Sequence, residues 1–443
     1  MAYSKEQLVE MYKIMQRCRL FDKKIATESK KGKLVGMFHF GTNQEAFEAG
    51  LMPLVGPDDY IKPYHRNHGC FTMCDMKLYV AGMLERTTGY NMGIGGDYHQ
   101  QDIQDLHLLP IDGLIGADWL YDAGVAMALK LQKKPGVVFS CQGDGAAQMG
   151  SLYESMNFAW MGLRPIVEFM YPDFVVLAIN EIAHGACKQY WLSNQKCPVP
   201  MVIRSAQGIG SQCGAHHSEC IEGWLMNYPG LKIAVPTFPE DAYGMMKYAI
   251  RDNDPVIWLD CRTTIYTEKA DIPEAEEDAL IPFGQARVRR EGADVTIVAW
   301  HKLLKDALAA AEDLEKQGIS CEVIDPRTLI PFDIDTVMAS VRKTGHLVIA
   351  HEANVRGGFG AEIAAQVTER DAGALKSPII RVGTPNTFIP VGMVEWEIVP
   401  DKMDVIRAVK NALGKELLEE EKGRVVVDGE AELKKSRPES KEN

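Results

Sequence analysis

The tripeptide Gly143-Asp144-Gly145 closes an apolar run over residues 137–141 and precedes a stretch with a helical pattern, residues 149–160. The apolar run predicts a strand, so the tripeptide stands where a strand leads into a helix. Glycine lets a ligand approach the backbone, Asp offers a hard oxygen to a metal ion, and the N-terminus of the next helix attracts phosphate. The same tripeptide is also a common turn without a ligand. The pattern therefore predicts an α/β fold with a candidate site for a metal-bound diphosphate.

Length and composition narrow the class of protein. A chain of 443 residues suggests about two or three domains. The net charge of −13 argues against nucleic acid as a partner, because binding to a phosphate backbone needs clustered Lys and Arg. No apolar run approaches the ~20 residues of a membrane span, and the N-terminus lacks a secretory pattern. The ten cysteines form no Cys-x-x-Cys pair, so we expect reduced, buried thiols in a cytoplasmic protein rather than disulfides or a zinc site.

The order of apolar runs and turns predicts two α/β segments. Residues 5–30 have helical spacing, and residues 58–260 alternate short apolar runs with helical segments. An acidic, loop-like stretch predicts a linker over 271–285, followed by a second domain over 286–414. The charged residues 415–443 predict a disordered tail. The strands expected from apolar runs are 136–141, 165–170, 201–204, 232–236, 256–260, 294–300, 320–325 and 346–351, with helices over 302–317, over 334–343 and from about 358.

Residues 8–162 resemble the alpha subunit of the thiamine-diphosphate-dependent 2-oxoacid dehydrogenases, in their decarboxylating component. The stretches that carry the resemblance are 36–46, 57–60, 65–69, 88–90, 112–117 and 143–146. Residues 163–415 resemble the beta subunit of the same enzymes, through stretches 163–170, 215–218, 249–255, 323–328 and 351–362.

The join near residue 162 omits the later part of the alpha subunit and the first part of the beta subunit. The resemblance therefore implies one hybrid thiamine-diphosphate-binding domain of transketolase-like α/β fold over residues 1–270, alpha-like to 162 and beta-like from 163. A transketolase C-terminal-like α/β domain follows. A single-chain synthase of the transketolase type is disfavoured, because such chains carry complete copies of both thiamine-binding domains.

In the alpha-like half, the resemblance assigns residues to the cofactor. Asp144, with Gly145 and Ala146, matches the family's first Mg²⁺ ligand and its turn. His65 and Arg66 match positions that reach the diphosphate, and a guanidinium suits phosphate through its forked donors. Gly113 and Ile115 match backbone contacts to the aminopyrimidine, and His39 matches an active-site histidine. Each of these residues also has an ordinary structural interpretation: an ion pair, loop packing, or a core or capped histidine.

In the beta-like half, the second metal ligand is normally an Asn twenty-nine residues after the first. That position holds Asp173, which can ligate Mg²⁺ but is also explained as a loop acid. Phe174 matches the aromatic that stacks on the aminopyrimidine, or is a core residue. His217 matches the histidine of acyl transfer, since a neutral imidazole carries protons near pH 7.

A second metal ion is implied less specifically. A loop that binds potassium in some family members matches Ala249, Asp252 and Asp254, although Asn-Asp-Pro loops are common turns.

One required group has no match. The family's cofactor-activating carboxylate is a Glu in the beta segment that is missing at the join. The equivalent strand end should fall near residues 64–67, which contain no acid.

Two functions remain open. The first is cleavage of a 2-oxoacid or acetoin on thiamine diphosphate and Mg²⁺, with transfer of the acyl unit to the lipoyl domain of a dihydrolipoyl acyltransferase core. A homodimer would supply one wall of the site from each copy. The second is a catalytically impaired fusion that acts in subunit assembly with intact alpha and beta subunits, or a relic of recombination.

Overall fold

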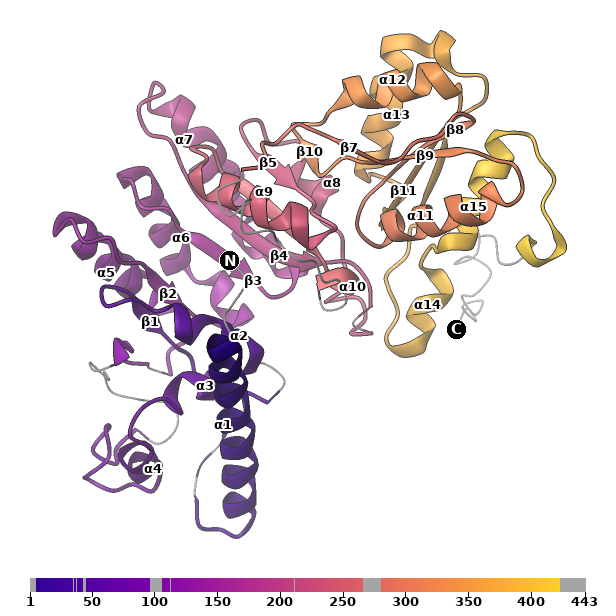
Figure 1. Ribbon diagram of the computed structural model, residues 1–443. Coiled ribbons are helices and arrows are strands. Elements are labelled where there is room, and N and C mark those ends of the chain that lie inside the picture. Colours follow the sequence, from indigo (N-terminus) through magenta and orange to yellow (C-terminus); the bar gives the residue numbers. More distant parts are fainter. Residues whose placement is uncertain are drawn as a thin grey trace, which may run out of the picture. The chain divides into compact units, whose positions relative to one another are not determined.

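The computed structural model describes residues 5–34, 36, 38–42, 45–95, 106–111, 113–210, 212–265 and 280–422. The chain divides into two compact units, residues 1–163 and 164–443, called here the N-terminal and C-terminal units (Figure 1). The boundary between them lies beside the join at residue 162 that the sequence predicts.

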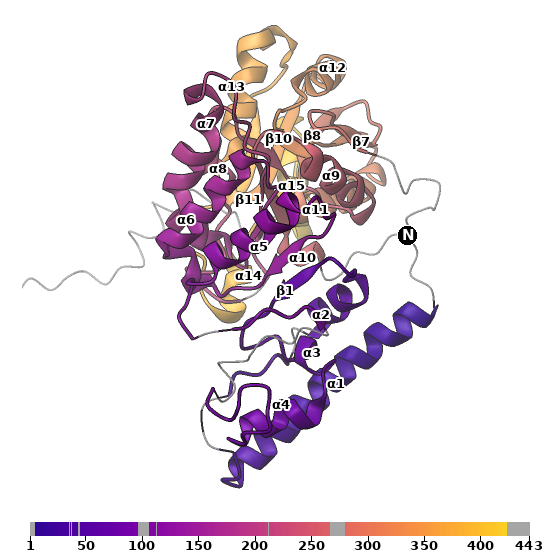
Figure 2. The ribbon, with the colours of Figure 1, turned by 90° about the vertical axis from the view of Figure 1, so that its left-hand side faces the viewer.

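The N-terminal unit is mostly helical around one small sheet. Its long first helix α1 runs alongside α2 and α3 (Figure 2) and buries Phe21 and Ile25 with Tyr79 of α4. Strands β1 (Tyr60–Lys62) and β2 (Val138–Ser140) pair in parallel, Tyr60 opposite Val138. The helices are α1 (Lys5–Lys30), α2 (Glu45–Leu51), α3 (His68–Phe71), α4 (Met76–Met83), α5 (Trp119–Leu131) and α6 (Gly150–Asn157), with 3-10 turns at Met52–Leu54, Asp144–Gln148 and Phe158–Met161.

The C-terminal unit begins with a five-stranded sheet in the order β10-β5-β6-β4-β3. Strands β3 to β6 are parallel, and only β10 runs antiparallel at the edge. All six residues of the central β6 are buried, as expected of a strand covered on both faces. The elements are β3 (Ile166–Phe169), β4 (Val202–Gln207), β5 (Lys232–Ala234), β6 (Val256–Cys261), β10 (Thr328–Ile330), α7 (Cys187–Leu192), α8 (Glu222–Leu225), α9 (Pro239–Arg251) and α10 (Arg262–Ile265), with a 3-10 segment Pro172–Ala178 and a π-helical segment Glu181–Ala186.

A second five-stranded sheet of the C-terminal unit has the order β12-β11-β8-β9-β7. Helices α11 and α15 cover one face, and α12 and α13 the other (Figure 1). An apolar core under α11 includes Ile297, Leu304 and Val409. The elements are β7 (Arg287–Arg290), β8 (Val295–Ala299), β9 (Cys321–Asp325), β11 (Leu347–Asn354), β12 (Ile380–Thr384), α11 (His301–Glu315), α12 (Ile334–Thr344), α13 (Phe359–Asp371), α14 (Glu395–Ile398) and α15 (Lys402–Ala412), with 3-10 turns at Ala372–Ala374, Gly392–Val394 and Glu419–Glu421.

The strands and helices expected from apolar periodicity are present, with ends shifted by a few residues. In the described part of the chain, the two halves of the predicted hybrid domain have separate sheets, β1-β2 and β10-β5-β6-β4-β3. The extent of that domain, residues 1–270, stays a prediction. Most of the predicted linker, residues 271–279, and the end of the tail, residues 423–443, lie outside the described residues.

The start of the predicted tail is ordered. Glu421 is buried and its carboxylate accepts from Lys410 of α15 at 2.5 Å. An ion pair of this kind has no signature in a charged, low-hydropathy sequence. All ten cysteines are free thiols, six of them buried, but Cys213 is exposed, contrary to the expectation that all are buried. None of the described helices has the length and apolar character of a membrane span.

Candidate functional site

The site residues predicted in the N-terminal unit follow the carboxyl ends of its two strands. Because β1 and β2 are parallel, the segments after Lys62 and Ser140 leave the sheet at the same edge, and the amide of Cys141 donates to the carbonyl of Lys62 at 2.8 Å. Ligands of open α/β sheets bind at this edge. The sheet therefore carries residues 64–66 and 143–146 to one place.

The histidines predicted for this site lie together. The rings of His39 and His65 meet edge to face with centroids 4.7 Å apart. Arg66 donates from Nη1 to the carbonyl of Phe40 at 3.4 Å, so the guanidinium stays beside the segment that carries His39. These residues form a basic and imidazole-rich corner of the N-terminal unit.

The loop that contains Gly113 and Ile115 packs against the turn that contains Asp144. A Cβ on Gly145 would meet only Cγ2 of Ile115, at 3.8 Å. Ser151 anchors the loop by donating to the carbonyl of Gly116 at 2.5 Å. A Cβ on Gly143 would meet nothing within 4 Å, so the backbone on this side of the turn is open to a ligand.

The residues predicted in the C-terminal unit gather at the carboxyl edge of its first sheet. The ring of His217 contacts Tyr171 edge to face at 4.3 Å and Phe174 at 5.6 Å between centroids. Both oxygens of Asp173 are buried, and neither has a hydrogen-bond partner within the described residues. Burial raises the pKa of Asp173, while the nearby backbone amides of Asp173 and Glu219, and then the charges of His217 and Arg262, partly oppose that rise. A cation at this carboxylate would satisfy both oxygens.

Arg262 and Tyr171 were not predicted, although they position His217. Arg262 directly follows β6, donates to the carbonyls of His217 at 2.7 Å and Ala206 at 2.5 Å, and places its guanidinium 4.6 Å from the centre of the Tyr171 ring. Cation–π contact and hydrogen bonds together fix the histidine between two aromatic rings. In the sequence, the position of Arg262 directly after a predicted strand could have indicated this role.

The predicted potassium loop is held by cationic side chains. Arg164 donates to the carbonyls of Ile250 at 3.0 Å and Asp252 at 2.8 Å. Lys232 contacts the carboxylates of Asp252 at 2.6 Å and Asp254 at 3.0 Å. Ala249 is buried in the last turn of α9. These contacts give the loop a structural role, and potassium binding stays a prediction.

A buried carboxyl that was not predicted lies beside the strand end of β1. Glu48 of α2 accepts from Asn67 Nδ2 at 3.1 Å, and its other oxygen has no partner in the described part of the chain. A Cβ on Gly69 would lie 2.7 Å from Cβ of Glu48. Burial raises the pKa of Glu48 to about 7.

This carboxyl should make stability depend on pH. Between pH 4.5 and 7 the folded chain holds the Glu48 proton and the unfolded chain releases it, so unfolding becomes easier as pH rises. Between pH 4.5 and 7 the free energy of unfolding should therefore fall. We expect Glu48→Gln to reduce this fall by about 2–3 kcal/mol. Urea unfolding of both proteins at pH 4.5, 6 and 8 measures the difference, and parallel pH profiles would contradict it.

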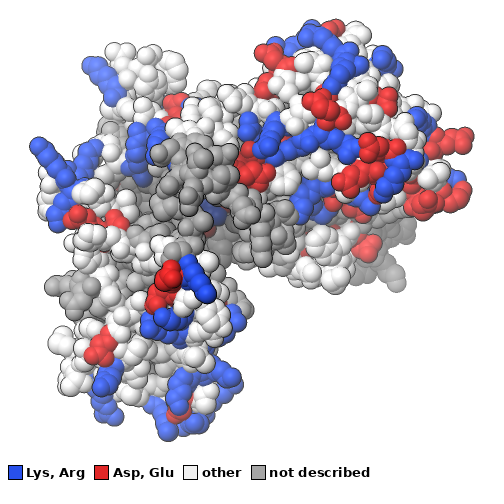
Figure 3. Space-filling view, in the orientation of Figure 1, with Lys and Arg blue, Asp and Glu red and all other residues white. Residues whose placement is uncertain are grey.

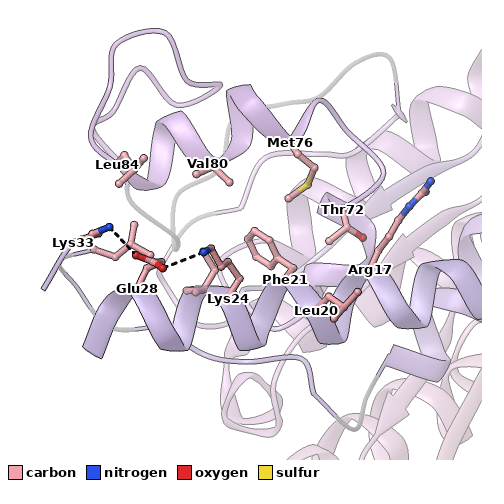
Figure 4. Close-up of a pocket in the computed structure, with 12 residues that line it drawn as sticks. Arg17, Leu20, Phe21, Lys24, Glu28, Lys33, Thr72, Met76, Val80 and Leu84 are labelled. Atoms are coloured by element: carbon pink, nitrogen blue, oxygen red, sulfur yellow. Dashed lines mark hydrogen bonds and ion pairs between the residues drawn. The ribbon is translucent and has the colours of Figure 1, made fainter. Parts of the chain in front are cut away.

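A cavity lies elsewhere in the N-terminal unit. It has a volume of about 610 Å³ between α1 and α4, with Phe21, Met76 and Val80 facing it and Lys24 and Lys33 contacting Glu28 at its rim (Figure 4). No predicted site residue lines it. On the face shown in Figure 3, Lys and Arg lie among Asp and Glu over much of the described surface.

Comparison with known proteins identifies the class to which these sheets and strand-end residues belong. Residues 12–184 match the dehydrogenase E1 component family, 155–265 the transketolase pyrimidine binding domain, and 284–405 the transketolase C-terminal domain. The first two matches overlap around the join. The fold is therefore transketolase-like, as the sequence predicted.

The chain is similar to beta subunits of the pyruvate dehydrogenase E1 component. It is 42% identical to the mitochondrial subunit of Pisum sativum over 257 residues, covering 57% of this chain and 71% of that protein. Identity to the Bacillus subtilis (strain 168) subunit is 35% over 252 residues, covering 57% and 77%. Identity to the human mitochondrial subunit is 38% over 270 residues, which cover 60% of this chain and 75% of that protein.

A solved split-gene transketolase, described as an inactive beta4 tetramer, has a TM-score of 0.51 and 25% identity, covering 63% of this chain and 85% of that one. The chain belongs to the thiamine-diphosphate-dependent 2-oxoacid dehydrogenase E1 family. Membership of this family implies thiamine diphosphate as cofactor.

Proposed function

We propose that the protein binds thiamine diphosphate with Mg²⁺, cleaves a 2-oxoacid or acetoin, and passes the acyl unit to a lipoyl group of a partner acyltransferase. Family membership supports the reaction class. The observation that carries the proposal is the pair of residue groups at the carboxyl ends of parallel strands, one group in each unit. The proposal includes a dimer in which each copy supplies one group.

The N-terminal group would hold the diphosphate end of the cofactor. Asp144 would bind Mg²⁺, the open backbone at Gly143 and Gly145 would approach the phosphates, and His65 and Arg66 would supply positive charge. Ile115 borders the same turn, and Gly113 and Ile115 would contact the aminopyrimidine through the backbone.

The C-terminal group would hold the aminopyrimidine and handle the acyl unit. Asp173 fits a second Mg²⁺ ligand because its two buried oxygens have no partner in the described residues. Phe174 would stack on the ring, and His217, fixed by Tyr171 and Arg262, would move a proton at its imidazole during acyl transfer. When bound, the cofactor supplies the electron sink for bond cleavage.

A second function is favoured by one specific observation. Residues 64–67, which follow β1, contain no acid, and the family's activating glutamate has no equivalent there. A protein that binds the cofactor without rapid turnover, or that acts only in assembly with intact alpha and beta subunits, would show this pattern. Cofactor titration separates assembly alone from the proposed function, since only the latter requires Mg²⁺-dependent binding.

Phe174 offers a direct test of the aminopyrimidine position. An aromatic contact is worth about 0.5–1.5 kcal/mol beyond its area, so Phe174→Ala should weaken thiamine diphosphate binding about 3–10-fold or more. Calorimetric titration in excess Mg²⁺ measures the change. The matched control is Phe332→Ala, which removes a half-buried aromatic that precedes α12 and contacts Phe359 of α13, and should leave affinity unchanged. Equal effects of both substitutions on affinity would contradict the assignment of Phe174 to the aminopyrimidine.

A further inference from the structure

A cluster of three metal-binding residue types lies in the C-terminal unit, and none of the three belongs to the residues assigned above, although Cys261 adjoins Arg262. Cys261 ends β6, His301 begins α11, and Glu352 lies in β11. One ligand atom from each lies within 4.8 Å of the others, and the three residues are 1%, 1% and 4% exposed. The sequence separations are too long for any motif, so the fold alone brings them together.

Glu352 is oriented by backbone donors. Its Oε1 accepts from the amide of Lys302 at 2.9 Å and its Oε2 from the amide of Ile209 at 3.2 Å. A Cβ on Gly208 would lie 2.2 Å from Oε2, so only glycine leaves room for the carboxylate. Such donors around a ligand fix its direction and stabilise its ionised form, as is usual around protein-bound metals.

His301 is prepared as a ligand in the same way. Its Nε2 lies 3.0 Å from the carbonyl of Leu259, which can only accept, so Nε2 carries the proton and Nδ1 keeps a lone pair. A metal-binding histidine commonly donates its second nitrogen to a backbone carbonyl. The backbone of His301 also has a φ of 55°, a conformation that residues other than glycine adopt at an energetic cost.

The charges of the cluster suit a divalent cation. All three side chains are buried, and Cys261 Sγ lies 3.7 Å from Glu352 Oε1, to which it donates. A thiolate, a carboxylate and a neutral imidazole around a divalent ion sum to zero net charge, which is the least costly state for a desolvated site.

We propose that Cys261, His301 and Glu352 bind one divalent ion of the zinc class. Sulfur, nitrogen and oxygen donors in one set select Zn²⁺ over Mg²⁺, which prefers oxygen alone. Binding transfers the Cys261 thiol proton to solvent as the sulfur–metal bond forms. The ion connects β6 of the first sheet with α11 and β11 of the second. This role is independent of thiamine diphosphate.

The test uses the full chain, stripped with a chelator and then titrated with ZnCl₂ against a chromophoric competitor. We expect one ion per chain with sub-micromolar affinity and a higher midpoint of thermal unfolding. Co²⁺ in place of Zn²⁺ should give a thiolate-to-metal charge-transfer band. Cys261→Ser should remove that band and weaken Zn²⁺ binding at least tenfold, whereas Cys321→Ser, a buried thiol outside the cluster, should change neither.

Glu352→Gln provides a second variant if Cys261→Ser does not fold, because it keeps the shape of the side chain and removes its charge. It should also weaken Zn²⁺ binding while retaining the charge-transfer band at high Co²⁺. The proposal is overturned if the unmodified chain binds no Zn²⁺ below about 10 µM, an affinity far short of structural zinc sites. It is equally overturned if the variants that fold bind Zn²⁺ as tightly as the unmodified chain.

Discussion

Replacing Arg289 by Met should destabilise the C-terminal unit by about 3–5 kcal/mol, the cost of removing one partner from a buried ion network. The side chain of Arg289 is 8% exposed. It contacts Asp241 of α9, Asp325 of β9 at 2.7 Å and Glu240 at 3.3 Å, and packs its guanidinium 4.4 Å from the centre of the Phe238 ring. Without it, Asp325 is left buried beside Asp241 with no other cationic partner among the described residues. Urea unfolding followed by fluorescence and circular dichroism measures the loss.

The matched control removes an exposed guanidinium. Arg342 pairs with Asp371 at 3.0 Å, with 57% and 37% of these side chains exposed. Exposed pairs contribute little, so Arg342→Met should leave the unfolding midpoint nearly unchanged. If the two substitutions destabilise the protein equally, the network around Arg289 does not hold the two sheets of the C-terminal unit together.

Turnover should be slow even when the cofactor is bound. Residues 64–67 contain no acid, the neighbouring Glu48 is fully buried, and a positioned acid or base contributes about 10²–10⁴-fold. We therefore expect kcat for pyruvate or acetoin to fall by about that factor relative to a two-subunit member of the family. A dye-coupled decarboxylation assay at saturating cofactor and Mg²⁺ measures it.

Two readouts separate a chemical defect from a binding defect. Cofactor affinity measured in the same buffer should be within the ordinary range for the family, so that the loss lies in kcat. Exchange of the reactive thiazolium proton of bound cofactor into deuterium oxide should be slow to the same extent. Turnover equal to that of the two-subunit enzyme would show that another group of this chain performs the missing proton transfer.

The regular elements were largely predictable because most residues of buried strands are apolar. The runs at residues 295–299 and 321–325 are buried throughout, with Thr296, Glu322 and Asp325 as their polar members, and stand between turn residues. Strand β10 was not predicted, because three residues between Pro326 and Pro331 give no periodicity. Its place at a sheet edge is set by pairing with β5, which is a tertiary effect.

The site was predictable where it follows strand ends and unpredictable where it depends on packing. Asp144 and Phe174 come soon after apolar runs, and both lie after the carboxyl ends of parallel strands. The cluster of Cys261, His301 and Glu352, by contrast, joins segments from two sheets. No pattern in one sequence reveals a contact of that kind.

Calorimetric titration of the full chain with thiamine diphosphate, with and without Mg²⁺, tests the central claim most directly. We expect micromolar binding that requires Mg²⁺ and is lost in Asp144→Ala and weakened in Asp173→Ala. Asp254→Ala, which removes a half-exposed loop acid, should bind as the unmodified chain does. Folded protein that takes up no cofactor in the presence of Mg²⁺ would contradict the proposed enzyme and leave the assembly function.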